Sequence, residues 1–297
     1  MSLYQFECAY HKQEGFQMEL KRDWVQILTR CKDKVKTQVR PLLKTLREPQ
    51  PDLGKGAGGD AMKPVDLAAE KAIVETLQQC EISFTLVSEE SGVQAFGETP
   101  RQCYVTVDPI DGTTNLVRGL PFYASSIAVS AEPMLSSVHA GVVADLAHDT
   151  LYFAQRGKGA YHDGEKITAS QLSVLGEAVV GLDLNTSSVK EVVPRLTRLI
   201  ESAGHIRHFG ANALELCYVA EGLTDAFVDI RGKLRTTDIA AGFLILREAG
   251  GIITVPEGET LDAKLHPRQK VKFVASGNAN IHKGILSFIG SEKERRC

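Results

Sequence analysis

Hydrophobic positions in the first third of this chain change from a helical to a strand spacing. At residues 23–46 and again at 65–77, apolar residues recur every three to four positions, which predicts two amphipathic helices. The segment 49–59 between them is rich in Pro and Gly and predicts a loop. Short apolar runs at 84–87 and 103–107 then predict buried strands. We therefore expect two helices followed by a sheet.

The remaining pattern predicts more strands and then an alternation of strands with helices. Apolar runs at 125–129, 140–143 and 151–154, separated by turn residues, predict an antiparallel meander. Beyond Leu172 we expect strands at 179–182, 225–229 and 273–276 and helices at 192–203, 214–220, 239–249 and 281–289. This indicates an α/β protein in two halves, residues 1–172 with the antiparallel sheet and residues 173–297 with a mixed α/β arrangement.

An acidic turn follows the strand predicted at 103–107. Asp108 and Asp111 lie three positions apart across Pro109, and Gly112 and Thr113 come next. Carboxylates at a strand end can bind a divalent metal, and the N–H groups of a following turn can bind phosphate. The alternative is an ordinary turn, because Asp-Pro and Asp-Gly pairs are common turn formers. The spacing does not fit an EF-hand, and neither the Rossmann nor the P-loop glycine pattern is present.

Further acids stand at the ends of other predicted elements. Glu89 and Glu90 follow the strand at 84–87, Asp238 precedes a helix, and Asp66 lies at the start of a helix. Each alone has an ordinary explanation, as a solvent-facing pair, an N-cap and a residue that suits the helix dipole. If they converge on one cavity, they predict a site for two or three divalent cations. Mg²⁺ is the natural ion, because the donors are all oxygen.

Charge and cysteine usage narrow the class of protein. The 34 Lys and Arg nearly balance the 37 Asp and Glu, giving a net charge of −3, so no nucleic-acid partner is predicted. No apolar run approaches a membrane span, and the N-terminal residues do not resemble a signal peptide. The six cysteines are scattered without a C-x-x-C pair, which favours reduced thiols in a cytoplasmic protein.

Four ordered motifs carry a family resemblance that covers most of the chain. Residues 108–113, Asp-Pro-Ile-Asp-Gly-Thr, resemble the signature of the inositol monophosphatase-like family of Mg²⁺-dependent, lithium-sensitive phosphatases. Residues 87–91 resemble its Gly-Glu-Glu segment, and residues 65–71 resemble its N-terminal threonine–aspartate helix. Residues 237–251 resemble its C-terminal signature.

Some positions depart from that pattern and point to a branch of the family. Thr237 stands where the family usually has Trp, and the segment 229–235 is longer and more basic than in animal inositol phosphatases. Lys63-Pro64-Val65 replaces small hydroxylated residues. These features resemble the archaeal-type branch, which often hydrolyses both inositol 1-phosphate and fructose 1,6-bisphosphate. The metal set is intact, whereas the sugar specificity stays open.

The resemblance implies a layered αβαβα sandwich and a role for each site residue. The implied Mg²⁺ ligands are Glu89, Asp108, the carbonyl of Ile110, Asp111 and Asp238. The implied catalytic residues are Asp66, Thr113 and Glu90, with Thr113 hydrogen-bonded to Asp66 to orient a water for in-line attack. The implied substrate contacts are the N–H groups of Gly112 and Thr113, together with Asp229, Arg231 and Arg207. Arg231, Lys233 and Arg235 either bind a second phosphate or only decorate a surface loop.

Two other functions remain open at this point. One is a 3′-phosphoadenosine-type nucleotidase, whose adenine pocket a sequence does not reveal. The other is a catalytically silent phosphate-binding homologue, which is disfavoured because Asp66, Thr113 and the metal ligands are all present. The resemblance also implies a homodimer acting on a small phosphorylated sugar or inositol.

Overall fold

The computed structural model describes residues 22–46, 48–185 and 188–289. Its helices are α2 (Trp24–Leu42), α3 (Pro64–Gln79), α4 (Thr113–Arg118), α5 (Val189–Ser202), α6 (Asn212–Glu221), α7 (Thr236–Glu248) and α8 (Ala279–Ile289). Short 3₁₀ turns lie at Pro100–Gln102, Leu135–Ser137 and Leu175–Glu177. Among the described helices, none is both long and apolar enough to cross a membrane.

The strands form two sheets. The first holds β1 (Phe84–Ser88), β2 (Gly92–Phe96), β3 (Tyr104–Asp111), β4 (Ala124–Ser130), β5 (Val138–Asp145), β6 (Thr150–Gln155), β7 (Gly159–His162) and β8 (Glu165–Ile167). Its order is β2-β1-β3-β4-β5-β6-β7-β8, antiparallel throughout except that β1 and β3 run parallel. The second holds β9 (Val179–Leu182), β10 (His205–Arg207), β11 (Ala226–Asp229), β12 (Ile252–Thr254) and β13 (Phe273–Ser276). Its order is β10-β9-β11-β13-β12, parallel from β10 to β11 and antiparallel beyond.

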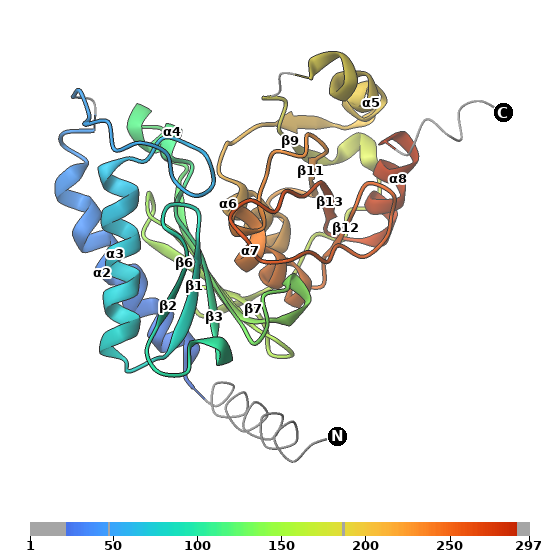
Figure 1. Ribbon diagram of the computed structural model, residues 1–297. Helices are drawn as coiled ribbons and strands as arrows, with labels where there is room; N and C mark the ends of the chain where they lie inside the picture. Colours follow the sequence, from blue (N-terminus) through green and yellow to red (C-terminus); the bar gives the residue numbers. More distant parts are fainter. Residues whose placement is uncertain (1–21, 47, 186–187, 290–297) are drawn as a thin grey trace, which may run out of the picture.

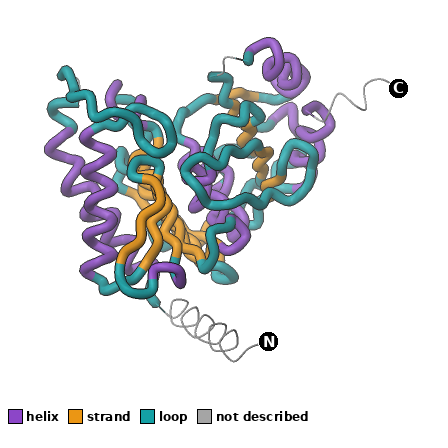
Figure 2. Tube along the Cα trace, viewed as in Figure 1, coloured by secondary structure: helices purple, strands orange, loops and turns teal. Residues whose placement is uncertain are grey.

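Helices and sheets alternate as layers (Figure 1). Helices α2 and α3 cover the outer face of the first sheet, α6 and α7 lie between the two sheets, and α5 and α8 cover the second sheet. Figure 2 shows the two long outer helices standing beside the strands of the first sheet. This arrangement confirms the predicted αβαβα sandwich.

Alternation along the strands explains the layers. In β4, Ala124 and Ala128 belong to the core between the sheets, whereas Ile127 and Val129 pack under α2 and α3. Because successive side chains of a strand point to opposite faces, one strand serves two cores. A third core lies beneath α5 and α8. Small residues line the inner face of β4, which leaves room for α7 to lie against it.

Several details differ from the sequence prediction, which also lacked the short strands β7, β8, β10 and β12. Strand β2 was not predicted, because three of its five residues are exposed and its pattern carries little hydrophobic signal. Helix α7 begins at Thr236 rather than after Asp238, so Asp238 is in its first turn and is not the N-cap. The two threonines at 236 and 237 are fully buried, and tertiary packing outweighs their weak helix propensity.

Candidate active site

The parallel pairing of β1 with β3 brings two acids together. Ser88 pairs with Val107, and both strands end at the same edge of the sheet. The next residues along the two strands are Glu89 and Asp108, which therefore lie side by side although 19 positions separate them. A parallel register thus converts two strand ends into one acidic edge.

Strand β3 is irregular where its second acid appears. The pairing of β3 with β4 shifts between Asp108 and Asp111, and Pro109 in this stretch has no N–H to donate. The irregularity turns Asp111 toward the other half of the molecule. Its carboxylate accepts the backbone N–H of Asn212 at 3.0 Å and that of Ala213 at 2.7 Å, in the first turn of α6. Asp111 therefore connects the first sheet to the helix layer between the sheets.

The third acid of the cluster comes from α7. One oxygen of Asp238 accepts the backbone N–H of Arg235 at 2.9 Å, which fixes the carboxylate at the helix start. Ligand oxygens of Glu89, Asp108 and Asp238 all lie within 4.8 Å of one another. Three carboxylates from three separate segments thus converge, as the sequence predicted for an acidic metal site.

Burial makes this cluster electrostatically unfavourable without a cation. Loss of solvent, followed by the charges of Glu89, Asp111 and Asp238, raises the pKa of Asp108 well above its usual range. Burial and then the charge of Asp238 raise the pKa of Glu89 to about 8, although Arg235 opposes the shift. Burial raises the pKa of Asp111 to about 7 against the hydrogen bonds that it accepts. A buried all-oxygen donor set with excess negative charge fits a hard divalent cation such as Mg²⁺.

The predicted Asp66–Thr113 pair lies next to these acids. The Thr113 hydroxyl is 2.9 Å from the carbonyl oxygen of Ile110 and 3.4 Å from a carboxylate oxygen of Asp66. Burial raises the pKa of Asp66 to about 6. Burial, and next the charges of Asp66 and Glu70, raise the pKa of Glu90 to about 7. The site therefore holds acids that change protonation near neutral pH.

A cavity of about 570 Å³ joins these groups to the second half of the chain. The predicted site residues on its wall are Asp66, Glu89, Glu90, Asp108, Ile110, Asp111, Gly112, Thr113, Arg231 and Asp238. Asp229 and Arg207 are not on that wall. Asp229 is fully buried behind Arg231, and Arg207 is exposed on β10. The structure thus gathers the predicted metal and catalytic residues but does not bring two predicted substrate contacts to the cavity.

The structure adds residues that the sequence prediction missed. Lys63, Asp183, Asn185 and Lys270 also line the cavity. The glycine-rich loop, residues 54–62, overlaps the segment 49–59, which was predicted only as a loop. It is held against the acids by the N–H of Ala57 on the carbonyl of Glu90 at 2.9 Å and the N–H of Gly58 on that of Glu89 at 2.8 Å.

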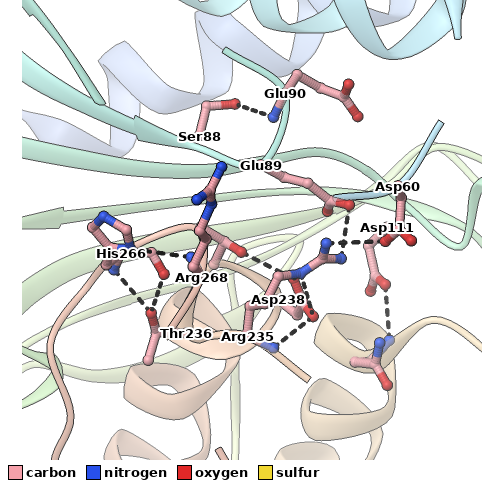
Figure 3. Close-up of polar contacts among 12 residues, drawn as sticks. Asp60, Ser88, Glu89, Glu90, Asp111, Arg235, Thr236, Asp238, His266 and Arg268 are labelled. Atoms are coloured by element: carbon pink, nitrogen blue, oxygen red, sulfur yellow. Dashed lines mark hydrogen bonds and ion pairs between the residues drawn. The ribbon is translucent and has the colours of Figure 1, made fainter. Parts of the chain in front are cut away.

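Arg235 was predicted only as part of a basic loop, yet it lies among the carboxylates. Figure 3 shows its guanidinium between Glu89, Asp60 and Asp238. The one sequence signal for this placement was its position three residues before Asp238, the spacing of a capping pair. Its contacts with Asp60 and Glu89 join segments far apart in the sequence.

Comparisons with known proteins agree with the geometry. A model of the inositol monophosphatase family matches residues 22–292. The fructose-1,6-bisphosphatase/inositol-1-monophosphatase of Methanothermobacter thermautotrophicus is 36% identical over 272 residues, covering 89% of this chain and 95% of the relative. The bifunctional NADP phosphatase/NAD kinase of Methanococcus maripaludis is 34% identical over 256 residues, covering 80% of this chain but only 44% of that longer protein.

A solved structure described as an inositol monophosphatase-fructose 1,6-bisphosphatase shares the fold. It superposes with a TM-score of 0.80 at 27% identity and covers 90% of this chain and 100% of its own. The family match spans all of the described residues, including every element that supplies an acid to the site. The chain therefore belongs to the inositol monophosphatase family of phosphatases.

Proposed function

We propose that this protein is a Mg²⁺-dependent phosphomonoesterase that hydrolyses inositol 1-phosphate and fructose 1,6-bisphosphate. The observation that carries the proposal is the convergence of Glu89, Asp108 and Asp238 beside the Asp66–Thr113 pair. The names of the relatives from Methanothermobacter and Thermococcus support both substrates. The family membership and the all-oxygen cluster support a divalent cation.

Two or three ions would be held by Glu89, Asp108, the Ile110 carbonyl, Asp111 and Asp238. Bound there, they would supply positive charge to the phosphate and lower the pKa of a water. In this proposal Thr113 and Asp66 orient that water and accept its proton. A pKa of about 6 leaves Asp66 ionised at neutral pH and able to act as a base.

Other groups would bind the substrate or transfer protons. The N–H groups of Gly112 and Thr113, where the chain turns from β3 into α4, would bind phosphate oxygens. Glu90, on the cavity wall with a pKa of about 7, would take part in proton transfer.

Cations on the cavity wall support a substrate with a second phosphate. Arg231 is engaged in ion pairs with Asp183 and Asp229, so its charge is already neutralised. Lys233 and Lys270 are exposed and line the same cavity, and the Lys233 ammonium donates to the carbonyl of Asn185 at 2.8 Å. We therefore assign a second phosphate to Lys233 and Lys270 instead of Arg231. Asp229 and Arg207 would act on substrate only through a change in position.

The test is phosphate release in the presence of Mg²⁺ from inositol 1-phosphate and from fructose 1,6-bisphosphate. Asp111→Asn should lose nearly all activity on both, because it weakens an ion ligand that also anchors α6. The exposed Glu165→Gln serves as the matched control and should keep wild-type turnover. Lys233→Gln should lower turnover of the bisphosphate more than that of inositol 1-phosphate.

Two results would contradict the proposal. One is activity that survives Asp111→Asn, which would point to a contaminating phosphatase. The other is no release from either substrate by protein that binds Mg²⁺. In that case the nucleotide substrates become the leading candidates.

NADP is the second candidate substrate, supported by the relatives named as bifunctional NADP phosphatases in two organisms. Its 2′-phosphate is also a monoester, as is the phosphate of a 3′-phosphoadenosine substrate. Including NADP and 3′-phosphoadenosine 5′-phosphate in the assay distinguishes a nucleotide phosphatase from a sugar-phosphate phosphatase. A higher kcat/KM on either nucleotide than on the sugar phosphates would make that nucleotide the proposed substrate.

The family resemblance further supports a homodimer. Light scattering on the purified protein tests this directly, and a mass near the 32.3 kDa of one chain would contradict it.

A further inference from the structure

Arg235 places a different nitrogen of its side chain on each of three acids (Figure 3). One terminal nitrogen is 2.7 Å from Glu89 Oε1, and the other is 3.0 Å from Asp60 Oδ2. Its Nε is 3.2 Å from Asp238 Oδ1. The Arg235 side chain is only 13% exposed, and those of Glu89 and Asp238 are 13% and 4% exposed, so these two contacts are shielded from solvent. Charge-assisted contacts of a planar guanidinium are stronger and more directional than contacts of a lysine.

Two of these three acids belong to the carboxylate cluster. Glu89 and Asp238, with Asp108, are the residues whose oxygens converge within 4.8 Å. A divalent cation on those oxygens would lie close to a guanidinium that already contacts them. Like charges repel at this separation, and the carboxylates cannot satisfy both cations fully. The guanidinium and a metal ion would therefore compete for the same two carboxylates.

Asp60 stands apart from the cluster. It lies on the glycine-rich loop, its side chain is 76% exposed, and Arg235 is its partner across 175 positions. The loop packs directly on the guanidinium, since a Cβ at Gly58 would lie 2.4 Å from an Arg235 terminal nitrogen. Arg235 thus has one acid outside the cluster and two within it.

We propose that Arg235 is an internal competitor of the metal ion for Glu89 and Asp238. The inference rests on the proposed metal site. An ion that binds there displaces the guanidinium from the two carboxylates. Arg235 then remains paired with Asp60 and so stays in contact with the glycine-rich loop. Arg235 therefore lowers the affinity for the metal and stabilises the acid cluster when no metal is bound. The opposite role, a support that strengthens the ligands, predicts a change of opposite sign.

Calorimetric titration of Mg²⁺ and Mn²⁺ into metal-stripped protein tests the proposal without an activity measurement. Arg235→Gln should bind about tenfold more tightly, the equivalent of one charge-assisted contact. Its melting temperature in EDTA should fall below that of the wild type, and the difference should narrow with saturating Mg²⁺. Arg268→Gln is the matched control, because Arg268 reaches the same loop through the carbonyl of Ala57 at 3.1 Å. That variant should leave metal affinity unchanged.

The outcomes separate this inference from the proposed function. Unchanged or weaker metal binding in Arg235→Gln, with normal binding by the wild type, would overturn the competitor role alone. No divalent-ion binding by the wild type would overturn the metal site itself. If Arg235→Gln does not fold, Arg235→Lys carries the same test. It keeps the charge but contacts fewer acids at once, so its metal affinity should also exceed that of the wild type.

Discussion

Two groups of buried acids adjoin the same cavity and differ in how their charge is balanced. In the first, Glu89, Asp108 and Asp238 converge, and a single guanidinium contacts Glu89, Asp238 and the separate Asp60. In the second, Asp183 and Asp229 share Arg231, whose side chain is only 4% exposed. Arg231 contacts Asp229 through Nε at 3.0 Å and also through its own backbone N–H at 2.9 Å.

The contrast shows that burial of acids does not by itself make a metal site. In the second group burial also raises the pKa of Asp229, but the hydrogen bonds and the charge of Arg231 oppose the shift, and its ion pairs hold both acids. In the first group burial raises the pKa of Glu89 to about 8 in spite of Arg235. Negative charge that the protein leaves unmatched is what favours a cation at the proposed site.

The largest expected effect comes from Asp108→Asn in the first group. Activity should fall on the order of 10⁴-fold, since the proposed ions would lose a shared ligand. In EDTA at pH 8, however, the variant should be more stable than wild type by about 1–2 kcal/mol, because it removes a repelled buried charge. The folded-state pKa of Asp108 is raised, so its stability contribution is present at low pH and is lost as pH rises.

Urea denaturation at pH 8 and pH 5 measures this effect. The advantage of Asp108→Asn should shrink at pH 5, where the wild-type carboxyl becomes protonated more readily. If Asp108→Asn is less stable than wild type at pH 8 in EDTA, the first group does not carry unmatched negative charge, and the contrast with the second group is wrong.

The second group should respond to mutation in the opposite way. Arg231→Gln leaves Asp183 and Asp229 buried without their cation, and we expect a loss of about 3–5 kcal/mol of stability. Denaturation in urea measures the loss, with the exposed neighbour Lys233→Gln as control, expected to change stability by less than about 0.5 kcal/mol. A small loss for Arg231→Gln would mean that the pair is not structural.

The smallest effect concerns His282, a buried base whose partners are hydroxyls. Its ring nitrogens lie 2.9 Å from the Thr254 hydroxyl and 2.8 Å from that of Ser276. Burial lowers its pKa to about 4. A depressed folded-state pKa contributes stability above the unfolded value near 6.5 that is lost as pH falls toward 4.

Melting curves between pH 7 and pH 4.5 test the contribution of His282. The wild type should lose about 1 kcal/mol more than His282→Asn over this range. The exposed His205→Asn should keep the wild-type slope. If stability falls equally with pH in His282→Asn and wild type, burial does not lower the pKa of His282.

The sequence predicted those features that depend on local pattern. The long apolar runs that became β3, β4 and β5 were strong signals, and acids at strand ends predicted the cluster. Strand β2 carried a weak signal, because its surface-facing residues resemble a loop. The start of α7 was predicted too late, since Thr236 and Thr237 favour a helix only through burial.

Interactions between distant segments were beyond sequence reasoning. The basic segment 229–235 suggested free positive charge, whereas Arg231 and Arg235 are each neutralised by acids from other segments. No local pattern indicates that Asp60 meets Arg235 or that Asp183 meets Arg231. Of that segment only Lys233 is exposed, and it lines the cavity.

Asp111 ties the assembly of the site to two particular amide protons. Those of Asn212 and Ala213 donate to its carboxylate, and at the start of a helix they have no partner within the helix itself. Their exchange with deuterated solvent therefore requires Asp111 to release them or the neighbouring layers to separate. Hydrogen exchange at two backbone amides in the second half of the chain therefore reports whether Asp111, in the first half, is still in place at the acidic edge.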